Sequence, residues 1–391
     1  MQYSKNYDYI IAGAGASGLS LLWYLLHSSL REKKILVVDE NLYPANDKTW
    51  CFWDMKNIPF DTLIRSEWKR LTVISPEYTF TGDLQDSSYH ALSSYDFTHH
   101  VLDFAREFNN IHFLESEILS FDETGSGAEL LTNDGRFGAN LIFQSVFSPP
   151  DIESAKSDIS LKQHFKGWEI ETTENLFDKQ KAILMDFDID QRNGFSFMYH
   201  LPLSEKRSLV EYTLFTKELL PRDDYDPVIM KYLSDKFGME QSDFTVHRTE
   251  YGVIPMEDKR YPVWYNKNTM NIGTVGGWTK PSTGYTFTRI QQRCKKIVEA
   301  LEKGLHPEIR NGSSYRFRVY DIMILYLINS DPQKSVHLFQ TLFKTSGFDK
   351  VLKFLDEKTS FAEELVIFSK LPYKPFFEAI YKMKHRIFTG A

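Results

Sequence analysis

The architecture of this chain is set near its start, by residues 7–18, which read YDYIIAGAGASG. The first six of these predict a short buried strand, and the apolar residues that continue through Leu26 predict a helix. Between strand and helix, Gly13, Gly15 and Gly18 have the spacing G-x-G-x-x-G. The first glycine permits a tight turn, the second lets the backbone approach a pyrophosphate, and the third lets the helix pack on the strand. A dinucleotide site is therefore expected at the helix N-terminus, whose free N–H groups favour phosphate.

A second strand supports this interpretation. Residues 34–38 are mainly apolar and are followed by Asp39, about 20 residues after Gly18. An acidic side chain at that place can accept hydrogen bonds from a ribose. The alternative is a tight turn that serves helix–strand packing alone. The motif does not choose between a flavin and a nicotinamide, but its place at the start of a long chain favours FAD.

Composition narrows the class of protein. A length of 391 residues predicts two or three domains, and a net charge of −7 argues against a nucleic-acid partner. Only two cysteines, Cys51 and Cys294, are present, which excludes a disulfide framework and suits a reducing cytoplasm. We expect a chain that starts in the cytosol, because no apolar run is long enough to span a bilayer and no secretory signal is visible. The aromatic content of 15% is high enough to line a long apolar pocket.

The pattern of elements predicts an α/β fold in three parts. Residues 1–150 together with 257–304 alternate strands and helices, as in an FAD/NAD(P)-binding, Rossmann-like doubly wound domain. Residues 151–256 hold longer, aromatic-rich strands and predict an inserted β-rich substrate domain, as in flavin hydroxylases. Residues 305–391 predict a helical C-terminal region. The strands expected in the first part include 70–75, 78–81, 111–114, 129–132, 141–145 and 269–273, with helices over 94–108 and 286–303.

Two connections are candidates for cofactor contact. Residues 41–60 predict a long loop that carries Lys48, Trp50 and Trp53. The two tryptophans either cover a flat cofactor or anchor the loop in the core, and the sequence leaves both open. The glycines between 273 and 284 predict a mobile loop with exposed backbone, and the helix after it should point its N-terminus at whatever that loop holds.

The most informative acid is Glu211, which lies in the strand LVEYTLF at residues 209–215. Strand alternation places it on one face with Leu209, Thr213 and Phe215. A carboxyl among such side chains loses hydration, so its pKa should rise and the neutral acid should be favoured. Protonating a poor base such as an alkene requires an acid of that kind. The plainer interpretation is an edge-strand glutamate that reaches solvent or pairs with a basic residue.

Other candidate groups give weaker signals. Glu250, near the end of a predicted strand over 244–256, is a second candidate acid whose role the sequence leaves open. His99, His100, His164 and His200 do not have metal-ligand spacing, so we expect no metal site and place them on the surface or in the core. No G-x-S-x-G nucleophile motif is present.

Taken together, these segments resemble the flavin-dependent lycopene β-cyclases of bacteria. The resemblance covers nearly the whole chain. The matching segments are the glycine turn, residues 48–50 (KTW), 209–213 (LVEYT), 252–255 (GVIP), 276–285 (GGWTKPSTGY) and 317–321 (FRVYD). The glutamate strand and the loop ending in PSTGY are far more specific than the glycine turn.

The resemblance implies an activity and its cofactors. Members of this family cyclise the ψ-end groups of lycopene to β-ionone rings, giving γ-carotene and then β-carotene without net redox change. They need reduced FAD, which NAD(P)H or another donor supplies with electrons. By resemblance, Glu211 is the essential acid. The expected cofactor contacts are Gly13, Ala14, Gly15, Gly18 and Asp39 on the adenine side, and Lys48, Trp50, Thr274, Gly276, Gly277, Gly284 and Tyr285 on the flavin side.

The resemblance also implies where the protein works and what it binds. Lycopene resides in membrane, so the enzyme should dock there, peripherally on the inner face of the cell membrane. Residues 334–391 hold ten Lys/Arg against six Asp/Glu, and such basic amphipathic helices suit anionic lipid, although solvated packing helices also fit.

Two alternative functions remain open. One is an FAD monooxygenase or prenyl-chain reductase on the same scaffold, and the other is a non-enzymatic protein that escorts prenyl groups.

Overall fold

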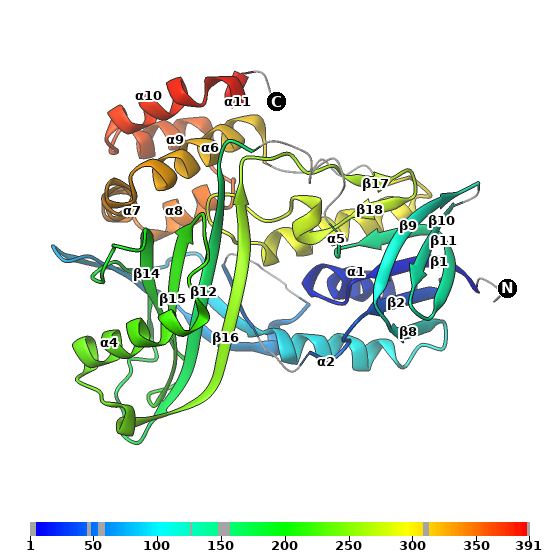
Figure 1. Ribbon diagram of the computed structural model, residues 1–391, viewed down its shortest axis with the longest axis horizontal. Helices are drawn as coiled ribbons and strands as arrows, with labels where there is room; N and C mark the ends of the chain where they lie inside the picture. The colour runs from blue at the N-terminus through cyan, green and yellow to red at the C-terminus, as the bar shows by residue number, and fades with distance from the viewer. Residues whose placement is uncertain are drawn as a thin grey trace.

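The computed structural model describes residues 5–44, 48–53, 59–125, 127–147, 157–307 and 313–388. It is a mixed α/β fold of the Rossmann-like flavoprotein type (Figure 1). A nucleotide-type sheet with its helices occupies one end of the molecule, a sheet of long strands occupies the other, and a group of C-terminal helices covers the end of the long strands. The expected boundary at 150–151 lies outside the described residues.

The first sheet begins with the glycine-turn strand. β1 (Lys5–Ala12) lies between β11 (Gly135–Gln144) and β2 (Ile35–Asp39), parallel to both. The strand order is β17-β18-β11-β1-β2-β8, and helices α1, α2 and α5 pack against one another beside it. This confirms the Rossmann-like expectation. The remaining bounds are β8 Ile111–Glu115, β9 Ile118–Thr124, β10 Gly127–Thr132, β17 Trp264–Asn266, β18 Thr269–Asn271, α1 Ala16–Leu26, α2 Ser94–Ala105 and α5 Phe287–Glu302.

The second sheet holds the long strands and differs from expectation at one edge. Its order is β16-β12-β15-β14-β13-β5-β6. The last two strands, β5 (Arg70–Ile74) and β6 (Thr79–Asp83), were expected in the first sheet. Instead, β5 pairs in parallel with β13. Its side chains Leu71 and Val73 therefore lie in the hydrophobic core of the second sheet. The sequence of a short apolar strand does not indicate which strand pairs with it. The other bounds are β12 Ser160–Thr172, β13 Lys181–Asp186, β14 Phe195–Pro202, β15 Arg207–Thr216 and β16 Phe244–Glu257.

A small third sheet replaces part of the loop expected over 41–60. β3 (Thr49–Trp53) pairs with β7 (Tyr89–Ser93), which also pairs with β4 (Ile64–Trp68). The expectation of one long connection was therefore wrong for residues 49–53. Aromatic side chains from all three strands are buried, which explains why this short sheet is stable between the two larger ones.

Helices cover both faces of the second sheet. Helix α4 (Tyr225–Phe237) packs against one face, and the C-terminal helices share an apolar core with the other. The helical expectation for this C-terminal region is confirmed, and no helix in the described ranges is long and apolar enough to cross a bilayer. The C-terminal helices are α6 Tyr315–Ser330, α7 Pro332–Ser346, α8 Phe348–Leu355, α9 Phe361–Phe368, α10 Tyr373–Lys382 and α11 Lys384–Phe388, and short 3-10 turns occupy Asp61–Leu63, Arg222–Asp224, Gln241–Asp243 and Gly273–Gly276.

Candidate active site

The glycine turn has the geometry that its spacing predicts. Gly13 adopts a φ of 104°, in the region that favours glycine, and a Cβ on Gly18 would lie 2.0 Å from the carbonyl oxygen of Gly13. A Cβ on Gly15, in contrast, would meet no protein atom within 4 Å. Gly13 and Gly18 are thus required by the turn itself, whereas the space beside Gly15 is open to a ligand. Asp39 lies next to this turn, where its Oδ2 accepts a 2.6 Å hydrogen bond from the backbone N–H of Ala14.

A cavity of about 560 Å³ runs from this turn to Glu211. It begins at Gly15, Ala16 and Ser17 and passes between the two large sheets. Five of the residues expected on the flavin side line it: Lys48, Trp50, Thr274, Gly284 and Tyr285. The N-terminal residues of α5 also line it, as expected for a helix that points at the site. One continuous space therefore joins the predicted cofactor site to the predicted acid.

Two of the contacts expected on the flavin side, Gly276 and Gly277, do not line this cavity, and neither do Gly13, Ala14, Gly18 and Asp39 on the adenine side. A Cβ on Gly276 would lie 2.5 Å from the backbone oxygen of Asn271, and Gly277 adopts a φ of 68° against the side chain of Tyr261. The turn alone therefore accounts for glycine at positions 276 and 277. Within the loop, Trp278 and most of its neighbours are buried, whereas Gly273, Thr274 and Gly284 line the cavity.

Glu211 and Glu250 form a carboxyl pair, and a glycine makes the pair possible. Gly167 on β12 lies opposite Glu211 of β15 on one side and opposite Glu250 of β16 on the other. The three residues form a row across adjacent strands, and residues in such a row point to the same face. A Cβ on Gly167 would lie 3.3 Å from Cβ of Glu211 and 3.2 Å from Cγ of Glu250. The missing side chain leaves room for the two carboxyls to lie close enough to influence each other electrostatically.

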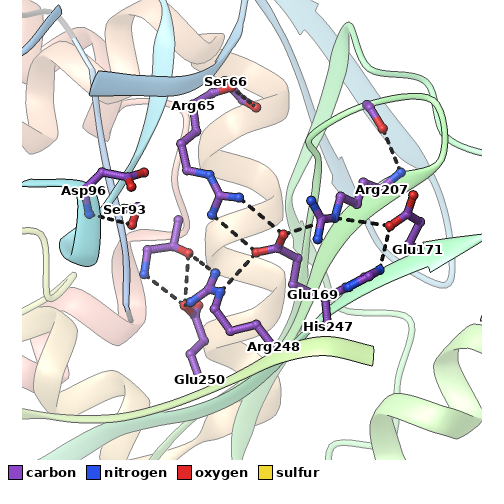
Figure 2. A network of polar contacts seen from close by, with 12 residues as sticks. Arg65, Ser66, Ser93, Asp96, Glu169, Glu171, Arg207, His247, Arg248 and Glu250 are labelled. Atoms are coloured by element: carbon purple, nitrogen blue, oxygen red, sulfur yellow. Dashed lines mark hydrogen bonds and ion pairs between the residues drawn. The ribbon is translucent and has the colours of Figure 1, made fainter. Parts of the chain in front are cut away.

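The two carboxyls have opposite surroundings. Thr49 donates to Oε2 of Glu250 from its backbone N–H at 2.9 Å and from its hydroxyl at 3.0 Å, and Arg248 pairs with the same oxygen at 2.7 Å. Figure 2 shows Arg248 between Glu250 and Glu169, with Arg65 reaching Glu169 from above and Arg207 on the far side of Glu169. A cation and two further donors suit a carboxylate.

Within the described ranges of the chain, no cation forms an ion pair with Glu211. It is 8% exposed, and its Oε1 accepts a 2.8 Å hydrogen bond from the hydroxyl of Thr213. Burial raises the pKa of Glu211 well above its ordinary value, and the charge of Glu250 raises it further. This confirms the predicted desolvation and adds a second cause, the neighbouring carboxylate. Two close carboxyls in unlike surroundings separate into one neutral acid and one anion.

Two tyrosines, Tyr199 and Tyr285, line the Glu211 end of the cavity, and the buried Tyr89 joins them. Tyr199 lies directly opposite Glu211 in the β14–β15 pair. Its hydroxyl hydrogen-bonds to that of Tyr89, which in turn bonds to that of Tyr285 at 2.7 Å. Burial raises the pKa of all three phenols, so they remain neutral. They present aromatic faces and polar tips without adding charge.

The two tryptophans of the 41–60 segment have different roles. Trp50 is half-buried, lines the cavity and packs near Phe97 and Phe287, with ring centroids 5.3 and 5.7 Å away. Trp53 is buried and donates from Nε1 to the carbonyl oxygen of Leu352 at 3.2 Å. Of the two interpretations left open, cavity lining fits Trp50 and core anchoring fits Trp53.

Sequence reasoning missed several residues of this site. Gly167 is one, because the whole strand β12 was not predicted, and its burial pattern does not follow the simple alternation that marks a strand in sequence. Tyr89 and Tyr199 are two more, and nothing in their local sequence marks them. The histidines behave as expected for core residues where they are buried: His164 bonds to Thr216 at 2.7 Å, and burial lowers its pKa to about 4.

Comparison with known proteins places this site in a family. The sequence model of one protein family, described as "Lycopene cyclase protein", matches residues 8–381 of this chain. The chain belongs to the lycopene cyclase family. A lycopene beta-cyclase of Pantoea ananas is 23% identical, over 96% of this chain and 97% of that protein. A lycopene beta-cyclase of a Paracoccus species is 24% identical over 72% and 70%.

The fold of this lycopene cyclase family member recurs among solved structures. A geranylgeranyl bacteriochlorophyll reductase-like protein of Thermoplasma acidophilum has a TM-score of 0.62 and 13% identity, with 98% of this chain and 99% of that chain covered. At this identity the likeness concerns the fold. It shows that the two large sheets and the helical C-terminus are a recurrent arrangement rather than a peculiarity of this chain.

Proposed function

We propose that this protein is a lycopene β-cyclase that converts the ψ-end groups of lycopene to β-ionone rings by acid catalysis, giving γ-carotene and then β-carotene. The observation that carries the proposal is Glu211. It is a buried, neutral-favouring acid at the end of a cavity that begins at a dinucleotide turn. Membership of the lycopene cyclase family supplies the class of substrate.

The acid step follows from the carboxyl pair. The O–H bond of Glu211 breaks as a C–H bond forms at the terminal double bond of the polyene, which leaves a tertiary cation. The neighbouring alkene attacks that cation and forms the ring C–C bond. The ring cation then loses a proton as its C–H bond breaks, and this proton restores the carboxylic acid of Glu211. Substrate and product are isomers, so the sequence consumes no electrons. We therefore assign the protein to the intramolecular lyases, within the isomerases.

The cavity walls support a cation in two ways. The negative charge of Glu250 lies beside Glu211, and the ring of Tyr199 lies across the strand pair from it. A cation over an aromatic face is stabilised by about 0.5–2 kcal/mol. Apolar residues such as Leu209 and Phe215 fill much of the remaining wall and exclude water that would trap the cation.

The residues at the other end of the cavity fit FAD. The open space beside Gly15, the N-terminus of α1 and the carboxylate of Asp39 suit the pyrophosphate and ribose of a dinucleotide. Lys48, Trp50, Thr274, Gly284 and Tyr285 would hold the flavin half. Reduced FAD would supply an electron-rich ring beside the developing cation, with NAD(P)H as its reductant. We further propose that the protein works as a peripheral protein on the cytoplasmic face of the cell membrane.

The test is a glutamine exchange in a host that accumulates lycopene. Glu211→Gln keeps the shape of the side chain and removes its acidic proton, so it should fold, bind flavin and form no rings, as read by pigment chromatography. Glu218→Gln is the matched control, because that side chain is exposed outside the cavity, and it should cyclise normally. Cyclisation by Glu211→Gln at the wild-type level would contradict the assigned role of the acid.

A second measurement separates the cyclase from redox enzymes of similar fold. A monooxygenase or a prenyl-chain reductase consumes one NAD(P)H per product, whereas a cyclase should form many products per reduced flavin. Nicotinamide absorbance is followed beside product formation in the purified protein. One-to-one consumption would remove the cyclase proposal, and binding of prenyl compounds without any product would favour an escort protein.

A further inference from the structure

An apolar cleft adjoins the Glu211 cavity on the side of the C-terminal helices. It lies among α6, α7 and α9, and shares wall residues with the cavity, including Ser282, Phe339 and Leu342. Its outer wall is formed by Phe368, Leu371 and Phe376, at the end of α9 and the start of α10. The cleft therefore lies directly beside the cavity of about 560 Å³, and the shared residues form the wall between the two spaces.

Aromatic side chains are exposed on the surface above this cleft. Tyr373, Phe377 and Tyr381 on α10 are 65%, 67% and 67% exposed. They follow one another at intervals of four residues, so they lie along one face of the helix. On α9, Phe361 and Leu365 have the same spacing and are also exposed. We call these five side chains, four of which are aromatic, the aromatic stripe. Exposed apolar groups gathered in this way indicate a binding surface rather than scattered surface residues.

The charge around the α10 part of the stripe is positive. Lys370, Lys374, Lys382 and Lys384 are all exposed, and the only acidic residue between 370 and 388 is Glu378. On α9 the exposed Glu363 is paired with Lys353 at 2.6 Å. Lysine stems can lie along apolar surface while their ammonium groups reach the headgroups, and each basic residue near an anionic bilayer adds to the attraction. Figure 1 shows α10 at the outer edge of the helical region, away from the nucleotide-type sheet.

These observations indicate which partner binds this surface and by which route the substrate reaches Glu211. The identity of the substrate rests on the proposed function. We propose that the aromatic stripe seats α9 and α10 in a bilayer containing anionic lipid, and that the polyene passes from the lipid to Glu211 through the cleft beneath them. The end group that reacts occupies the Glu211 cavity, while the rest of the chain lies in the cleft. The cleft holds only about 40 Å³ in this structure, so α9 and α10 must move away from α6 when the chain enters.

Vesicle flotation tests the surface without requiring catalysis. The full-length protein should float with vesicles of phosphatidylglycerol and phosphatidylcholine and bind pure phosphatidylcholine at least tenfold more weakly. A triple variant, Tyr373→Ser, Phe377→Ser and Tyr381→Ser, should lose flotation but still cyclise detergent-dispersed lycopene. Tyr95→Ser, at an exposed aromatic on α2, is the control and should float as the wild type does. Flotation of the triple variant at the wild-type level would overturn the docking surface.

A substitution that fills the cleft tests the proposed route of the polyene. Leu371→Trp, at a partly buried position in the outer wall, should keep flotation and flavin binding yet lower turnover of lycopene at least tenfold. It should cyclise a shorter polyene with the same end group at nearly the wild-type rate, because that substrate does not reach the cleft. Phe368→Trp is the second variant if the first fails to bind flavin. Equal loss on both substrates, or no loss on either, contradicts the route, whereas a wild-type protein that cyclises neither substrate contradicts the proposed function.

Discussion

Replacement of Gly167 by alanine should damage catalysis more than stability. The added Cβ would lie 3.1 Å from Cδ1 of Leu209, 3.2 Å from Cγ of Glu250 and 3.3 Å from Cβ of Glu211, so each neighbour must yield by a few tenths of an ångström. Overpacking of this kind costs about 1–3 kcal/mol, and the lower chain entropy of alanine returns about 0.5–1 kcal/mol. The expected loss of stability is therefore about 1–2 kcal/mol.

The effect on turnover follows from the separation of the two carboxyls. A misplacement of 1 Å costs about 10²-fold in rate, so a displacement of roughly half that size should cost about tenfold. The assay is cyclisation of detergent-dispersed lycopene by purified variant, with flavin content and thermal unfolding measured beside it. Gly125→Ala is the control, because a Cβ there meets no atom within 4 Å. If Gly167→Ala kept wild-type turnover with flavin bound, the close approach of the carboxyls would have no catalytic role.

Three further predictions follow. Gly15→Ala should fold like Gly125→Ala, because no protein atom obstructs either Cβ, but it should lose at least tenfold in flavin affinity by titration; unchanged affinity would contradict the assigned approach of the pyrophosphate. The native state keeps a proton on Glu211 that the unfolded chain releases, so stability falls as pH rises from the ordinary glutamate pKa to the raised one, by about 1.4 kcal/mol per unit of pKa difference. Glu211→Gln should therefore be more stable than wild type in urea at pH 8 and no more stable at pH 4, and a gain that does not depend on pH would disprove this linkage. Arg248→Gln leaves Glu169 and Glu250 without the cation that they share and should cost about 3–5 kcal/mol in the same urea experiment, whereas a cost below 1 kcal/mol would show that Arg65 and Thr49 suffice.

Local signals explain which parts of the fold were predictable. The glycine turn, the helix over 287–302 and the C-terminal helices each combine a strong period with clear turn chemistry, and all were expected. The partners of β5 and β6 were not predictable in this way, since a strand of five residues records how its faces are buried and not which strand lies beside it. The same limit hid β3 inside what reads as a loop.

The candidate site shows the same division. The alternation around Glu211 was enough to predict its face and the direction of its pKa shift, because both depend on residues within its own strand. The partner carboxyl depends on Gly167 and on the pairing of three strands, which sequence spacing does not reveal. Gly276 and Gly277 show another limit, since glycine required by a turn and glycine required by a ligand look alike in sequence.

The pairing of β5 with β13 has a consequence for how the chain acquires its structure. Residues 70–74 and 181–186 are joined across more than a hundred intervening residues, and the contact closes a parallel ladder. Pairings of such wide sequence separation form slowly, because the entropy of closing the loop is lost before any contact compensates for it. During synthesis on the ribosome, β5 can pair only with β6 until β13 emerges, and in this interval the other edge of β5 is open to aggregation. A fragment holding residues 157–258 alone would lack this edge of the sheet, so the two sheets mature together.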